Sequence, residues 1–151
     1  MPNPTTDRLL LDAMLGKLAT YLRMCGYDTA TVTDETDEED VLTRLEADNR
    51  VLVTRDRELT RRASEAVLLT ERAVEDQLRE LDAAGFVLEL PDDPVRCGAC
   101  NGRLERVDRT APTPSYTPDP ADVTVWRCVE CGQHFWKGSH WDDVAAMLSN
   151  V

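Results

Sequence analysis

The chain has 151 residues, and its 29 acidic residues against 17 lysines and arginines give a formal net charge of −12 at pH 7. No run approaches the roughly 18 apolar residues that a membrane span requires, and the polar, acidic start lacks a signal-peptide pattern. These features argue against a membrane protein and against a generic nucleic-acid binder, and we expect a cytoplasmic protein. Only two of the basic residues are lysines, which is typical of a halophile-like acidic surface.

The first predicted elements are a strand and the helix that follows it. Three consecutive leucines at 9–11 indicate a strand buried on both faces, and from Leu15 the apolar residues recur at helical spacing. Asp12 lies where the two patterns meet. Because ligands bind at the carboxyl ends of parallel strands, Asp12 is either a helix cap or a cation ligand. Cys25, on the apolar face of the helix, is expected to be a buried small hydrophobe.

The next elements are a strand over residues 27–32 and a helix that opens in a run of acids. Six of the seven residues at 34–40 are acidic. Thr36, followed three residues later by Glu39, fits a capping box, and acids in a first turn complement the helix dipole. This local role explains most of the run but leaves individual acids available for other roles.

Further strands and helices continue the alternation up to about residue 90. The pattern predicts strands at 50–54 and 66–69 and helices at 57–64 and 74–84, while residues 86–90 either form a last strand or lead out. This order predicts an α/β domain over residues 7–90, with a mainly parallel sheet flanked by helices. The prolines at 91–94 mark the boundary to a second module at 91–151.

The second module contains two C-x2-C pairs separated by 27 residues: Cys97 and Cys100, then Cys128 and Cys131. Four thiolates at this spacing are typical of a closed, structural zinc site, with an iron centre or disulfides as the alternatives. Gly98 and Gly132 are expected to allow the two turns. We expect a zinc ribbon whose proline-rich stretch at 111–121 forms a hairpin tip, followed by a short C-terminal helix. His134 and His140 are expected at the surface or an interface.

A second acid follows a buried strand in the same way as Asp12. Asp56 comes directly after the strand at 50–54 and before a helix, so the two carboxylates are expected to converge at one sheet edge. Carboxylates without nearby histidine or cysteine favour Mg²⁺ or Mn²⁺. Asp37 and Glu38 are the candidates for a third acid. Thr54 either orients a carboxylate or belongs to ordinary strand packing.

Basic residues near these acids are candidates for binding phosphate groups. They are Arg55 and Arg57, with Lys17 and Arg23 on the first helix. The alternative is a solvated helix face balanced by neighbouring acids.

Several stretches together resemble the Mut-seven C-terminal RNase family, a branch of the PIN-like nucleases with an appended zinc ribbon. They are residues 11–19 (LDAMLGKLA), residues 53–56 (VTRD), the cysteine pairs and residues 136–141 (WKGSHW). The resemblance implies a PIN-like domain, bound Mg²⁺ or Mn²⁺, and action on RNA. Asp12 matches the first-strand acid of the family and Asp56 the acid of its Thr-x-Asp motif, while Phe135 stands where tyrosine is more usual.

The leading hypothesis is a metal-dependent ribonuclease in which Asp12, Asp56 and either Asp37 or Glu38 bind the ion. RNA is the expected partner, and no organic cofactor is expected. The ribbon either adds substrate contacts through Trp136, Lys137, His140 and Trp141 or uses them for packing, which we favour for Trp141. The alternative function is a non-catalytic nucleic-acid- or protein-binding adaptor that uses the ribbon on a degenerate PIN-like scaffold.

Overall fold

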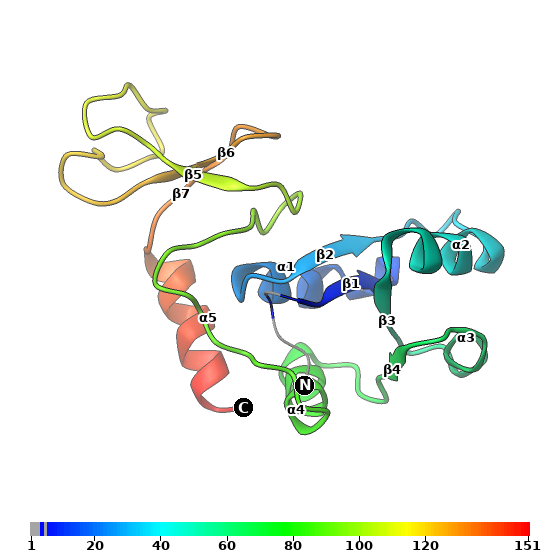
Figure 1. The fold of residues 1–151 in the computed structure, drawn as a ribbon. Helices are drawn as coiled ribbons and strands as arrows, with labels where there is room; N and C mark the ends of the chain where they lie inside the picture. Colours follow the sequence, from blue (N-terminus) through cyan, green and yellow to red (C-terminus); the bar gives the residue numbers. More distant parts are fainter. Residues whose placement is uncertain (1–3, 5) are drawn as a thin grey trace.

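The computed structural model describes Pro4 and residues 6–151. Within this part, a parallel sheet runs in the order β2-β1-β3-β4 with helices on both faces (Figure 1). Its strands are β1 (Arg8–Leu11), β2 (Asp28–Thr31), β3 (Arg50–Thr54) and β4 (Ala66–Leu68). The helices between and after them are a 3-10 turn, η1 (Ala13–Leu15), then α1 (Gly16–Met24), α2 (Glu38–Asp48), α3 (Arg57–Arg62) and α4 (Val74–Ala83). The predicted α/β class is confirmed. None of the helices in the described residues is long and apolar enough to cross a membrane.

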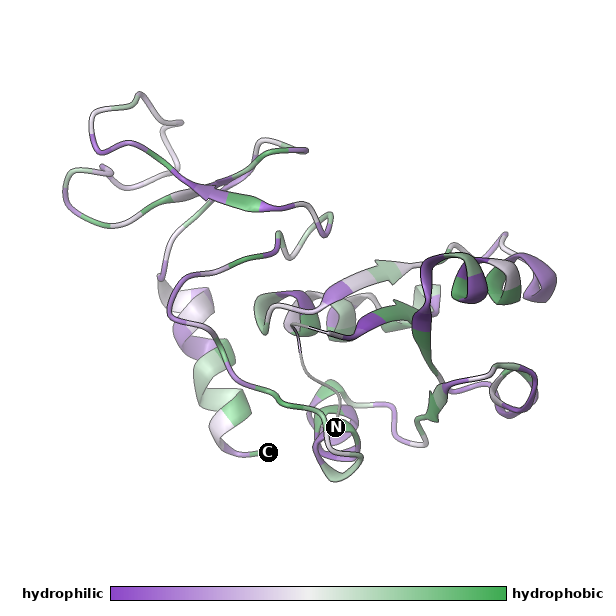
Figure 2. Ribbon diagram, in the orientation of Figure 1, coloured by the Kyte–Doolittle hydropathy of each residue, from purple (hydrophilic) through white to green (hydrophobic). Residues whose placement is uncertain are grey.

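The leucines of β1 form the centre of the core. Leu9 and Leu11 pack in one cluster with side chains of α1 and α4, whereas Leu10 packs in another with side chains of α2 and α3. All three are fully buried, as expected for a strand covered on both faces, and each contributes roughly 1.5–3 kcal/mol by leaving water. Apolar residues accordingly concentrate on the strands and the inner helix faces (Figure 2).

Cys25 belongs to the core cluster that covers Leu9 and Leu11. Its side chain is 2% exposed. Burial, reinforced by the charge of Glu89, raises the pKa of its thiol to about 12. The residue therefore behaves as the buried small hydrophobe that the sequence predicts.

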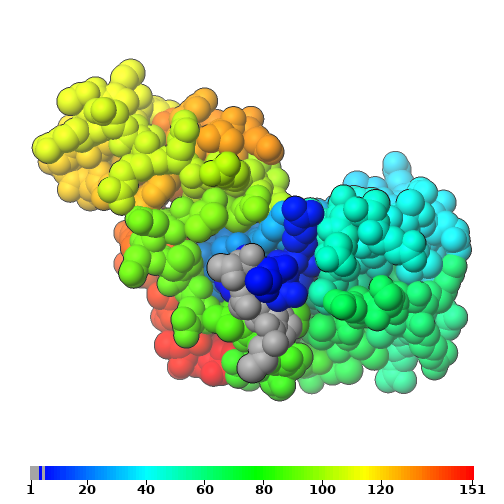
Figure 3. Space-filling model, viewed as in Figure 1, coloured from blue at the N-terminus to red at the C-terminus, as the bar shows by residue number. Residues whose placement is uncertain are grey.

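The C-terminal part forms a small antiparallel sheet and a final helix. The strands β5 (Leu104–Arg106), β6 (Trp126–Cys128) and β7 (His134–Phe135) pair in that order, with the proline-rich stretch between β5 and β6. This sheet forms a lobe beside the α/β body (Figure 3). Helix α5 (Ser139–Ser149) returns to that body, where Val144 is buried in the same cluster as Leu9.

The structure decides one open alternative and corrects one local expectation. Residues 86–90 form no strand, because the hydroxyl of Tyr27 donates to the carbonyl of Val87 and accepts from its N–H, so this segment leads out of the domain. The capping box is wrong by one residue. Asp37, not Thr36, caps α2, accepting a hydrogen bond from the Asp40 N–H at 2.8 Å.

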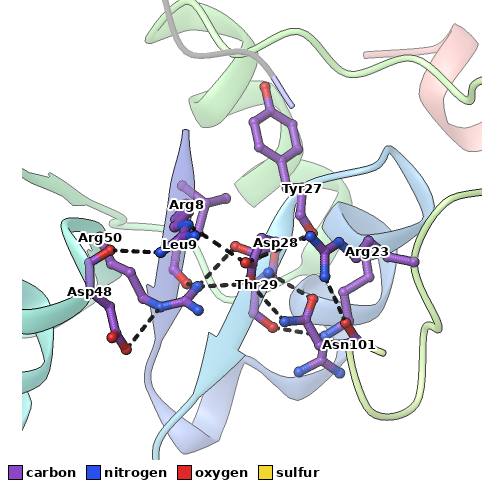
Figure 4. Close-up of polar contacts among 10 residues, drawn as sticks. Arg8, Leu9, Arg23, Tyr27, Asp28, Thr29, Asp48, Arg50 and Asn101 are labelled. Atoms are coloured by element: carbon purple, nitrogen blue, oxygen red, sulfur yellow. Dashed lines mark hydrogen bonds and ion pairs between the residues drawn. The ribbon is translucent and has the colours of Figure 1, made fainter. Parts of the chain in front are cut away.

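The ribbon contacts the amino end of the large sheet through Asn101. Its Nδ2 donates to Asp28 Oδ1 at 2.7 Å, and its Oδ1 accepts from the Thr29 N–H at 2.9 Å (Figure 4). Asp28 also accepts from Arg50 at 3.0 Å. Burial alone raises the pKa of Asp28, but the hydrogen bonds from Asn101 and Arg50 outweigh this effect and hold the pKa below the ordinary value of an aspartate. Asp28 is therefore ionised and links three segments.

Substituting Asn101 is expected to weaken this contact. Asn101 has a left-handed backbone with φ of 72°, and so does the exposed Asn49 at the end of α2, with φ of 53°. Asn101→Ala and Asn49→Ala introduce similar backbone strain, but only the first removes the two hydrogen bonds. We expect the free energy of unfolding in urea to fall by about 1–3 kcal/mol more for Asn101→Ala than for Asn49→Ala. In hydrogen exchange, the Thr29 amide should lose protection only in Asn101→Ala; equal protection in both variants would contradict the contact.

Candidate active site

Asp12 and Asp56 lie at the same edge of the sheet and are joined by one hydroxyl group. Leu11 at the end of β1 stands opposite Val53 of β3, so the residues that follow emerge side by side. The Thr54 hydroxyl donates to Asp12 Oδ2 and accepts from the Asp56 N–H at 3.0 Å. Because Thr54 is fully buried, this bridge is fixed. The structure thus favours the carboxylate-orienting role of Thr54 over ordinary strand packing.

Asp12 and Asp56 differ in whether their carboxylates also cap a helix. Asp12 precedes η1 but makes no side-chain capping bond, so the helix-cap alternative fails for this residue. Asp56 does cap α3, since its Oδ1 accepts from the N–H groups of Glu58 and Leu59 at 2.9 and 3.1 Å. Asp56 is exposed and Asp12 half-buried, so both can be reached from solvent.

The structure does not bring the proposed third acid to this pair. Asp37 caps α2, and Glu38 pairs with Arg62 of α3 at 3.2 Å. In the described residues, the cysteine cluster is the only group of three or more metal-binding side chains whose ligand atoms lie within 4.8 Å of one another. Asp12 and Asp56 therefore form no such group with a third carboxylate.

The structure contradicts one of the proposed phosphate-binding residues. Arg23 is only 7% exposed, and its guanidinium donates to the carbonyls of Thr29 and Gly98 at 2.9 and 3.0 Å. Burial is the main cause that lowers the pKa of this guanidinium. Arg23 therefore connects β2 to the ribbon and has no free surface for a phosphate group.

The other basic candidates are more accessible. Lys17 and Arg57 are exposed, while Arg55 is half-buried. Lys17 lines a groove of about 510 Å³, together with Met14 and Arg72. Met14 is 79% exposed, and neither Asp12 nor Asp56 is among the described residues that line this groove.

The four paired cysteines converge on one point in the ribbon. The sulfurs of Cys97 and Cys131 are 3.7 Å apart, and those of Cys100 and Cys128 are 3.5 Å apart. Zinc–sulfur bonds of about 2.3 Å place the sulfurs of a tetrahedral site roughly 3.8 Å apart. The donor set and its spacing therefore fit a closed, structural zinc ion, and neither histidine belongs to the cluster of described ligands.

The two cysteine turns, residues 97–102 and 128–133, have matching backbone geometry. In each, the first cysteine donates its N–H to the carbonyl five residues later, at 2.8 and 2.9 Å. The residue after the second cysteine is left-handed in both: Gly132 with φ of 80° and Asn101 with φ of 72°. Gly132 is as expected, but in the first turn Asn101, not Gly98, adopts the special conformation.

Asn101 is also a contact residue that the sequence analysis did not identify. The signal for it is its position, because it corresponds to Gly132 in the second turn. Asparagine tolerates the left-handed region and adds a side chain that can form hydrogen bonds. An asparagine at this position is therefore the residue most able to connect the turn to another element.

Comparison with known proteins gives one match. The family described as the Mut7-C RNAse domain matches residues 7–148, which is nearly the whole chain. None of the curated proteins or solved structures compared with the chain matches it. The match spans both the α/β domain with its acidic edge and the ribbon with its four cysteines, and the chain therefore belongs to the Mut7-C RNAse domain family.

Proposed function

We propose that this protein is a metal-dependent ribonuclease that hydrolyses RNA phosphodiester bonds at the sheet edge formed by Asp12 and Asp56. The observation that carries the proposal is the Thr54 hydroxyl, which holds both acidic segments at one place. Membership of a family named for RNase activity supports the same reaction class. A carboxylate bound to a buried hydroxyl, beside a second acid, is a typical oxygen-ligand site for a hard cation.

The residues at this edge divide the chemical work. Asp12 and Asp56 would hold Mg²⁺ or Mn²⁺, with Asp37 or Glu38 joining after a change of side-chain position. The bound ion would supply a water of lowered pKa and stabilise charge on the phosphate oxygens. Thr54 orients Asp12, which limits the carboxylate positions available. Lys17, Arg55 and Arg57 bind the phosphates on either side of the bond that is cleaved.

One observation favours a second candidate function. In the described residues, Asp12 and Asp56 form no group with a third acid in which all ligand atoms lie within 4.8 Å of one another, as expected for a degenerate site. The alternative is therefore a non-catalytic adaptor that binds nucleic acid or protein through the ribbon. Cleavage and binding assays separate the two candidates, because an adaptor binds its partner without Mg²⁺- or Mn²⁺-dependent cleavage.

Asp12→Asn and Asp56→Asn are expected to abolish cleavage while preserving the fold. Asparagine keeps an oxygen for the Thr54 hydroxyl and is a good helix cap, but it lacks the negative charge that binds the cation. The measurement is the Mn²⁺-dependent cleavage of labelled single-stranded RNA at high salt, with chelator as the blank. Glu46→Gln, which neutralises an exposed acid on α2, is the matched control and should cleave as the wild type does. Full activity in Asp12→Asn would contradict the proposed site.

Thr54→Val should weaken metal binding without removing any ligand. Valine has the shape of threonine but cannot donate to Asp12, so the carboxylate loses its fixed position. Losing such a supporting hydrogen bond lowers metal affinity about 10- to 100-fold. Mn²⁺ affinity, measured calorimetrically, should fall in Thr54→Val and recover in Thr54→Ser. Equal affinity in the valine variant and the wild type would reject the orienting role.

The cysteine cluster is proposed to hold one structural zinc ion per chain. Elemental analysis of the purified protein should find one zinc, and Cys97→Ser should lose it together with the ribbon fold. Because Thr20 and Arg23 donate to the Gly98 carbonyl in the first turn, hydrogen-exchange protection of the ribbon and of its contact with α1 should fall together. Cys25→Ser changes a cysteine outside the cluster and should retain the zinc. A zinc-free ribbon with full protection would contradict this role.

A further inference from the structure

A cavity of about 450 Å³ lies between the ribbon, α1 and the start of α5. Thr20 and Met24 of α1 form one wall, and residues of β7 and the first turn of α5 form another. Tyr116, from the proline-rich stretch, lies at its rim and is 55% exposed. This cavity is called the aromatic cleft below.

The lining of the aromatic cleft is richer in aromatic residues and poorer in acidic residues than the chain as a whole. Of the eight phenylalanine, tyrosine and tryptophan residues in the sequence, four line the cleft in the described structure: Tyr116, Phe135, Trp136 and Trp141. Both histidines, His134 and His140, line it as well. Although the chain has 29 acidic residues, none is among the described residues of the lining. The cleft therefore combines aromatic faces with an absence of negative charge.

Two of the residues that line the cleft carry a polar atom without a hydrogen-bond partner in the described part of the chain. Arg96 Nε and His134 Nδ1 are buried and have no hydrogen-bond partner within the described residues. A buried polar atom without a partner costs about 1–3 kcal/mol, so a ligand that supplies one gains from it. The edge of a nucleobase offers both donors and acceptors, and a hydrocarbon ligand offers neither.

The aromatic rings are held in place by neighbouring groups. The Tyr116 hydroxyl accepts from the His134 N–H at 3.1 Å, and the rings of Tyr116 and Trp136 are 6.2 Å apart. A Cβ atom at Gly138 would lie 2.7 Å from Trp136 Nε1, so the indole packs directly on that glycine. Ordered rings lose little side-chain entropy when a flat ligand stacks on them.

We propose that the aromatic cleft binds an unstacked base of single-stranded RNA, away from the bond that is cleaved. This inference rests on the proposed function in one respect, which is that the bound polymer is RNA. The ribbon turn that lines the cleft contacts the amino end of β2, whereas Asp12 and Asp56 lie at the carboxyl edge. The bound base therefore belongs to a nucleotide outside the one at the reactive phosphate, and it anchors the strand.

Charge favours RNA over a proline-rich peptide, the other polymer that aromatic grooves bind. Residues 95–141 contain six lysines and arginines against five acids, whereas the rest of the chain is strongly acidic. The two histidines lie in the lining itself, beside Arg96, whose charge is paired with Asp28. A phosphate beside the bound base would meet a lining that has no acidic side chain among its described residues.

The test measures binding of a labelled ten-nucleotide RNA to the zinc-loaded full chain. The chain carries Asp12→Asn and Asp56→Asn, so that the RNA probe is not cleaved during the measurement. Adding Trp136→Leu should lower the affinity roughly 5- to 100-fold, the usual effect of losing one stacked base. Trp136→Phe keeps a ring and should restore most of it. Tyr116→Leu changes an exposed ring and should weaken binding without disturbing the fold. Arg109→Gln removes an exposed ribbon cation outside the cleft and should leave the affinity nearly unchanged.

An abasic ribose-phosphate polymer of the same length provides the second probe. It should bind weakly and be insensitive to Trp136→Leu. Equal binding of the abasic and base-containing polymers would overturn the inference. The inference would also fail if a proline-rich peptide bound the cleft while Trp136→Leu left the RNA affinity unchanged. Cleavage is measured separately on the chain with native acids. Base-dependent binding without cleavage would refute the proposed function and support the anchoring cleft, whereas cleavage without base-dependent binding would do the reverse.

Discussion

The parallel pairing of β1 with β3 is the constraint on which both the core and the candidate site depend. With Leu11 opposite Val53, alternate leucines of β1 point to the two helical layers, and the segments after both strands emerge at one edge. A shift of this pairing by one residue would turn each leucine toward the opposite helical layer and move Asp12 away from Thr54. The same register therefore stabilises the fold and aligns the acids, so selection for a packed core also preserves the site.

The two ends of the large sheet have different roles, because the acid at the amino end is paired with arginines and the acid at the carboxyl end is not, within the described residues. At the amino end, Asp28 is surrounded by Arg8, Arg50 and Arg96, and this network connects the ribbon to the α/β domain. At the carboxyl end, Asp12 receives only a neutral hydroxyl in the described structure, which leaves its charge available. Several arginines of this acidic chain are therefore structural, and the number of basic residues overstates the surface available for phosphates.

The sequence predicts those features that follow from local periodicity. Three leucines in succession, two strand-end acids and paired cysteines were sufficient for the α/β class, the position of Asp12 and Asp56 at one edge of the sheet and the closeness of the four sulfurs. Features that depend on distant partners were not predictable in the same way. In the sequence, Arg23 has the pattern of an exposed helix arginine. Its burial depends on the Gly98 carbonyl, which lies 75 residues away in the sequence and accepts a hydrogen bond from it. The third acid is ambiguous for the same reason, since six acids within seven residues share one local pattern and only tertiary contacts distinguish them.

A net charge of −12 sets the physical problem that any RNA-binding function of this chain must solve. Long-range attraction is unfavourable for such a protein, and high salt further reduces what cations gain from releasing counterions. Base stacking on aromatic rings and metal-mediated phosphate contacts depend much less on that long-range field. The cleft around Trp136 has no acidic side chain among its described lining residues and suits base stacking. The proposed carboxylate site uses negative charge to bind a cation and suits metal-mediated phosphate contacts. Under the proposed function, the acidity of the chain would therefore favour RNA contacts that are few, short-range and separated along the strand.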